Sequence, residues 1–135
     1  MKRTLIATTL LAGLIAQTAQ ANFSLPVITW AGTYKDSNGG LMVVEEKPLL
    51  LNAWGADSAS IYQIACTRPS GDERSATCVG AGINHEQPNN PTRFTYRSQL
   101  RLNTDGSISE TWEALIGSQR RNGQSQFRRA GSAER

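Results

Sequence analysis

Residues 93–116 have the sequence RFTYRSQLRLNTDGSISETWEALI, in which apolar and polar side chains alternate on both sides of a turn signal. A period of two indicates strands with one buried face. Gly106 suits the left-handed position of a three-residue loop, Thr104-Asp105-Gly106, and that loop pairs Leu102 with Ile108. A two-residue loop would mix the faces, because a slip of one residue reverses every side chain. The stretch therefore predicts an antiparallel hairpin.

Glu110 interrupts the apolar face of this hairpin. The predicted register places its carboxylate opposite Leu100 and next to Trp112. Burying a carboxylate is costly unless it is paired or hydrogen-bonded, and burial raises its pKa. Two interpretations are open: Glu110 orients a ligand inside a barrel cavity, or it lies at the barrel rim, in solvent or beside an arginine.

The next turn is predicted at Asn122-Gly123, the dipeptide that type I′ hairpin turns favour. A two-residue loop there places Phe127 opposite Ser118 and on the same face as Trp112. The two turns are chosen independently and agree on one apolar face. They predict an antiparallel meander.

Cys66 and Cys78 are the two cysteines of the chain, and they predict one structural disulfide. If they pair directly across two strands, large side chains fall opposite Gly80 and Gly82, which suits a tightly curved sheet. A redox-active pair is the alternative, but the chain has no Cys-x-x-Cys motif.

Short apolar runs separated by turn residues continue along the rest of the chain, without helical spacing after the N-terminal segment. Many short strands and a means of curvature predict an all-β fold, a small antiparallel meander barrel of about eight strands. A β-sandwich is the alternative, although the cysteines are too close in sequence to join two sheets and no tryptophan lies between them. The expected strands are residues 27–35, 41–47, 49–54, 59–66, 76–84, 93–102, 108–116 and 125–130.

The segment Trp30-Ala31-Gly32-Thr33-Tyr34 is similar to the opening strand of small exported calycin-like barrels, which include lipocalin-like proteins and bacterial periplasmic lysozyme inhibitors. The likeness covers these five residues and the general layout of a leader, about 110 further residues, one disulfide and many strands. It implies a calycin-like barrel. No inhibitor signature is present, so no site residue is carried over from these families.

The N-terminal segment has the three parts of a secretory signal peptide: a basic start at Lys2 and Arg3, an apolar stretch over 5–16, and the cleavage motif Ala19-Gln20-Ala21. An uncleaved anchor is the alternative. We expect a periplasmic or secreted protein with no stable membrane insertion after cleavage. The expected division is a signal peptide at 1–21, one barrel domain at 22–130 and a flexible tail at 131–135.

Charge and composition limit the kinds of partner that the protein can bind. The 135-residue chain has 14 Lys and Arg against 11 Asp and Glu, but two of the bases belong to the predicted leader. The export signal and the nearly neutral remainder disfavour nucleic acid. Asn22 begins a glycosylation sequon whose relevance depends on the host.

Residues for catalysis are sparse. Two cysteines and a single histidine cannot form a Cys/His metal site, and no nucleophile elbow or phosphate loop is present. His85 beside Glu86 is either a general base or an exposed loop histidine. We expect no cofactor and no metal.

The sequence favours an exported, non-catalytic binding protein. It recognises either a protein partner through loops, such as 67–77 or 85–92, or a small apolar ligand in the barrel. Periplasmic inhibition of a cell-wall hydrolase and a small secreted enzyme using His85 or Glu110 are the alternatives. Trp30, Tyr96 and Trp112 fill the core or line a pocket for that ligand, which Glu110 would orient.

Overall fold

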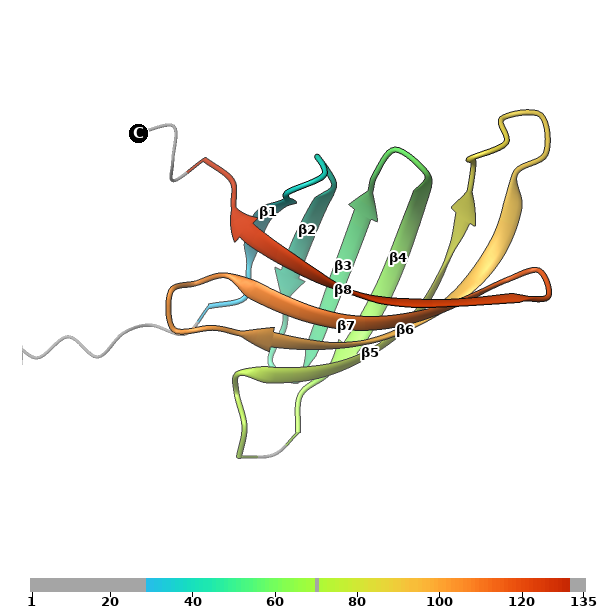
Figure 1. The fold of residues 1–135 in the computed structure, drawn as a ribbon. Coiled ribbons are helices and arrows are strands. Elements are labelled where there is room, and N and C mark those ends of the chain that lie inside the picture. The colour runs from blue at the N-terminus through green and yellow to red at the C-terminus, as the bar shows by residue number, and fades with distance from the viewer. Residues whose placement is uncertain (1–28, 70, 132–135) are drawn as a thin grey trace, which may run out of the picture.

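The computed structural model describes residues 29–69 and 71–131, and within them the chain is all-β, without a helix. The strands form a closed antiparallel barrel in chain order, in which the last strand pairs with the first (Figure 1). This confirms the meander barrel predicted from the sequence and rules out the sandwich. The strands are β1 (Gly32–Asp36), β2 (Leu41–Glu46), β3 (Leu50–Ala56), β4 (Ser60–Thr67), β5 (Ser75–Asn84), β6 (Thr92–Leu102), β7 (Ile108–Ile116) and β8 (Gln119–Arg129).

The β6–β7 hairpin has the predicted register. Leu102 pairs with Ile108, and Glu110 lies opposite Leu100. Gly106 has a φ of 86°, the left-handed conformation that the three-residue loop requires. Because the register is correct, the side chains of these two strands point to the predicted faces.

The β4–β5 hairpin is also as predicted, and its centre is a disulfide. Cys66 pairs directly with Cys78, with 4.0 Å between their Cα atoms, and both side chains are buried. Tyr62 lies opposite Gly82. A buried disulfide indicates an oxidising environment outside the cytoplasm.

The predicted turn at Asn122-Gly123 is wrong. The β7–β8 turn is formed by Gly117-Ser118, and Asn122-Gly123 lies inside β8. Gly117 has a φ of 61°, which fits the first central position of a type II′ turn. Phe127 therefore pairs with Ile108 rather than Ser118, a shift by an even number of positions, so Phe127 still faces inward.

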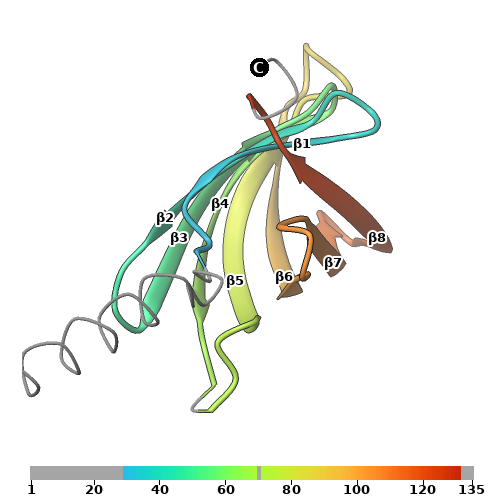
Figure 2. The same ribbon diagram turned by 90° about the vertical axis from the view of Figure 1, so that its left-hand side faces the viewer.

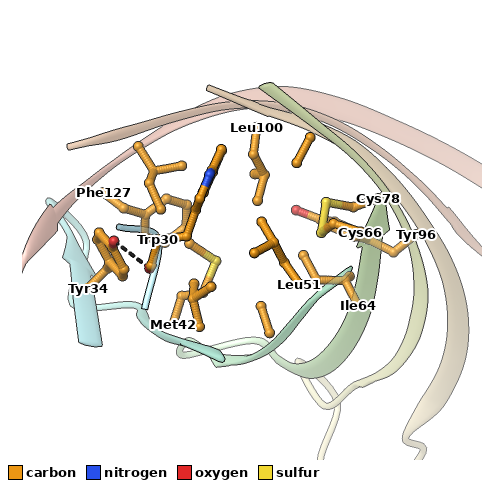
Figure 3. Close-up of a cluster of buried hydrophobic side chains, with 14 of the residues drawn as sticks. Trp30, Tyr34, Met42, Leu51, Ile64, Cys66, Cys78, Tyr96, Leu100 and Phe127 are labelled. Carbon is orange, nitrogen blue, oxygen red and sulfur yellow. Dashed lines mark hydrogen bonds between the residues drawn. A yellow bond between two sulfur atoms is a disulfide. The ribbon is translucent and has the colours of Figure 1, made fainter. Parts of the chain in front are cut away.

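One half of the barrel interior is filled by side chains. Trp30 is fully buried at its centre (Figure 3), and its indole Nε1 donates a hydrogen bond to the carbonyl of Glu73 at 2.8 Å. The Tyr34 hydroxyl donates to the Trp30 carbonyl at 2.7 Å. Figure 2 shows β2 to β5 on one side of this interior and β6 to β8 on the other. The other large, fully buried residues here are Met42, Leu51, Ile64 and Ile108.

Several predictions concern segments outside the described residues. They are the signal peptide at 1–21, the sequon at Asn22 and the tail beyond Gly131. Among the residues that are described, no helix is long and apolar enough to cross a membrane.

Candidate functional site

The other half of the barrel is hollow. A cavity of about 580 Å³ opens at the end where the β1–β2, β3–β4 and β5–β6 connections lie together (Figure 1). Its volume lies within the range of small-molecule sites, about 300–1,000 Å³. The disulfide and Trp30 belong to the filled half, and the cavity begins beyond them.

Aromatic rings form one wall of the cavity. The rings of Tyr62 and Tyr96 are stacked with centroids 5.4 Å apart, and those of Tyr96 and Trp112 are stacked at 6.1 Å. Phe94 meets Tyr96 edge to face at 6.2 Å. These residues come from inward-facing positions on β4, β6 and β7, and Gly80 and Gly82 of β5 lie between Tyr62 and the two rings of β6. Strand alternation points all four rings into the interior.

Glycines on the neighbouring strands make room for these rings. A Cβ atom at Gly55 would lie 2.0 Å from Cζ of Tyr62, and one at Gly123 would lie 2.8 Å from Cζ2 of Trp112. Each ring therefore packs against a strand backbone that carries no side chain at that point. This explains why Asn122-Gly123 belongs to a strand: the glycine accommodates the Trp112 ring.

We expect Gly123→Ala to displace the Trp112 ring and destabilise the protein by about 1 kcal/mol, because overpacking costs roughly 1–3 kcal/mol and the lower entropy of unfolded alanine offsets part of it. Near-ultraviolet circular dichroism and chemical unfolding measure the two effects. The same substitution in a Trp112→Leu background should cost less, and an equal cost in both backgrounds would show that the ring is not the obstacle.

Glu110 lies at the base of the cavity. The residue is only 3% exposed and, among the described residues, its Oε2 has no hydrogen-bond partner. Burial raises the pKa of Glu110, and the hydroxyls of Tyr96 and Ser98 partly offset this. Burial and the nearby Glu110 carboxylate raise the pKa of both Tyr62 and Tyr96. The cavity thus has at its base an acidic group whose burial is only partly offset by hydrogen bonds.

The rim of the cavity is acidic as well. Asp36 accepts hydrogen bonds from the backbone N–H groups of Asn38 and Gly40, so its carboxylate is held in the β1–β2 turn. Asp57 accepts from the backbone N–H of Ser60 in the β3–β4 loop in the same way. Both carboxylates line the cavity. Short acidic side chains stabilise turns by accepting backbone hydrogen bonds, which explains their presence in these connections.

One basic side chain balances part of this charge. Of the described residues that line the cavity, Arg121 alone is basic, and its Nη1 lies 3.0 Å from Oε1 of Glu86, another lining residue. The guanidinium beside Glu86 lowers the pKa of that carboxyl. Asp36, Asp57 and Glu110 therefore give the lining an excess of negative charge.

The barrel has a second opening beside Glu110. β1 pairs only with the last three residues of β8, from Phe127 to Arg129, and β8 extends well past it (Figure 1). A hollow of about 490 Å³ lies there, lined by Asp36, Glu110 and Ser125 among others. Glu110 thus lines both hollows.

The residues predicted for a ligand site separate into two groups. Glu110, Tyr96 and Trp112 line the cavity, and Glu110 lies in the interior rather than at the rim. Trp30 does not line it, because the tryptophan fills the closed half of the barrel.

His85, the candidate general base, is not among the residues that line the cavity, although its neighbours Asn84 and Glu86 are. Its backbone N–H donates to the carbonyl of Ala59 at 2.7 Å, which joins two rim loops. Within 29–69 and 71–131, no three His, Cys, Asp or Glu side chains are grouped to hold a metal ion.

Sequence reasoning missed Tyr62, Asp36 and Asp57 as cavity residues. Tyr62 was recognisable as a large residue opposite a glycine, which is the pattern that the cavity aromatics share.

Comparison of the chain with protein-family models and with curated protein sequences finds no match.

Proposed function

We propose that this protein is an exported, non-catalytic binding protein that holds a small ligand in the hollow half of its barrel. The observation that carries the proposal is the cavity of about 580 Å³, with aromatic walls and one buried carboxylate at its base. Ligand sites combine apolar and aromatic lining with few polar groups that set orientation. Tyr96, Trp112 and Glu110 have these roles here.

Export would place the ligand encounter in the periplasm or outside the cell. The signal peptide expected at 1–21 and the buried Cys66–Cys78 disulfide both support this location. A carrier that works outside the cytoplasm needs a stable scaffold, and the filled half of the barrel serves as that scaffold.

The two other predicted functions have less support. An enzyme using His85 requires this histidine at the cavity, where it does not lie. A protein partner, including a cell-wall hydrolase, would be recognised by the loops around 67–77 or 85–92, and no feature of those loops favours one partner over another.

Native mass spectrometry of protein purified from the periplasm tests the proposal. We expect a bound small molecule in the wild type and its loss in Ala114→Phe, because Ala114 lines the cavity and a phenyl ring there would occupy it. Ala81→Phe is the matched control, since Ala81 lies on the outer surface of β5. A co-purified protein in place of a small molecule, or a ligand that Ala114→Phe leaves bound, would contradict the proposal.

A further inference from the structure

We propose that the ligand is a small organic cation: a protonated amine whose N–H group meets Glu110 and whose body lies against Tyr96 and Trp112. This inference rests on the proposed function and names its ligand class. Three observations carry it: a buried carboxylate whose Oε2 lacks a hydrogen bond, a wall of aromatic rings beside it, and an acidic cavity lining.

The hydrogen bonding of Glu110 is incomplete. The residue is 3% exposed, the hydroxyls of Tyr96 and Ser98 face its carboxylate, and its Oε2 has no hydrogen-bond partner among the described residues. A buried acceptor left without a hydrogen bond is destabilising, and more so when it is charged. An ammonium group provides both an N–H donor and the opposite charge, so it satisfies Glu110 in both respects.

The aromatic wall suits the same kind of ligand. Tyr62, Tyr96 and Trp112 are stacked in series, with successive centroids 5.4 and 6.1 Å apart. Because stacked rings cover one another's faces, the wall offers the cavity an apolar aromatic surface. This surface packs against the apolar body of an amine, which explains why rings rather than further acidic groups surround Glu110.

The charge of the lining distinguishes an amine from an acid. Asp36 and Asp57 add negative charge at the rim, while Arg121 is already paired with Glu86. Asp36 and Glu110 line both hollows. An anionic ligand would meet carboxylates along its whole path, whereas a cation is attracted along it.

Isothermal titration calorimetry with three indole compounds tests the ligand class. Tryptamine carries the ammonium, tryptophol is its neutral analogue, and indole-3-propionate is anionic. We expect tryptamine to bind the wild-type protein at least about tenfold more tightly than tryptophol, and indole-3-propionate to bind most weakly, because charge-assisted hydrogen bonds are roughly twice as strong as neutral ones.

Glu110→Gln should lower tryptamine affinity by about tenfold to a hundredfold and leave tryptophol affinity nearly unchanged, since the substitution removes the charge and keeps the shape. Glu113→Gln is the matched control, because Glu113 lies on the same strand, faces outward and pairs with Arg120. Thermal unfolding of both variants checks that each is folded.

Binding of tryptamine should also weaken as the pH falls and Glu110 takes up a proton, while the amine itself stays charged, as alkylammonium groups do below about pH 10. The titratable groups that face Glu110 are Asp36, Tyr62 and Tyr96, with Asp57 near the tyrosines. The tyrosines do not titrate in the acidic range, so the part of the pH dependence that Glu110→Gln removes belongs to Glu110.

Two results would overturn the inference. Equal affinity for tryptamine and tryptophol would show that the cavity binds ligands without preference for a cation. That result would reject the proposed ligand class and leave the proposed function standing. Binding of none of the three compounds at millimolar concentration would also reject the amine, and the native mass spectrum of wild type against Ala114→Phe would then decide separately whether the cavity holds a ligand.

Discussion

Replacing both cysteines, as Cys66→Ala with Cys78→Ala, should lower the free energy of unfolding by about 3 kcal/mol, the value expected for a disulfide that closes a loop of this length. The bond links adjacent strands in the packed half of the barrel, where both side chains are buried. For a domain of about 100 residues this corresponds to a loss of roughly 10–20 °C in Tm. Thermal unfolding with and without a reductant measures the change.

The reductant provides the control for this prediction. A reducing agent should lower the Tm of the wild type towards that of the double variant and leave the double variant unchanged. If the double variant were as stable as the oxidised protein, the bond would contribute nothing to stability. Because the bond lies outside the cavity, Glu110 and the aromatic wall should keep their arrangement in the variant that still folds.

The register of the barrel was predictable where one local signal had no competitor. Gly106 is the only glycine between two strongly alternating runs, and the cysteine pair sets the β4–β5 register. Around β8 two signals competed: Gly117-Ser118 and Asn122-Gly123 both suit tight turns. The choice depends on Trp112, whose ring packs on Gly123 across the strand pair, and such a contact between strands is invisible to local turn preferences.

The division of the barrel into filled and hollow halves was not predictable from alternation. Trp30 and Trp112 both point inward, yet Trp30 fills the closed end and Trp112 lines the cavity. The difference arises because Trp30 reaches across the interior to the Glu73 carbonyl, whereas Trp112 packs against Gly123 on the neighbouring strand. Alternation tells which side chains point inward, but how far each extends depends on the packing of all the strands together.

Replacing the buried carboxylate, as Glu110→Met, should raise the free energy of unfolding at neutral pH by about 1–3 kcal/mol, because it removes a buried charge whose Oε2 lacks a hydrogen bond and keeps a similar volume. Glu113→Met on the same strand is the matched control. Its carboxylate is exposed and pairs with Arg120 in solvent, so its removal should change stability by less than about 1 kcal/mol.

The pH dependence identifies the source of this gain. The folded protein holds the pKa of Glu110 above its ordinary value of 4.5, so the folded state binds more protons than the unfolded state between the two values. Wild-type stability should therefore fall as the pH rises through this interval, relative to Glu110→Met, and the two proteins should be closest in stability below pH 4.5. Chemical unfolding from pH 4 to 8 measures the difference, and a constant gap would mean that ionisation of Glu110 is not its cause. A carboxylate that reduces stability whenever the cavity is empty is consistent with a role in binding, because a cationic ligand would supply the partner that the fold leaves out.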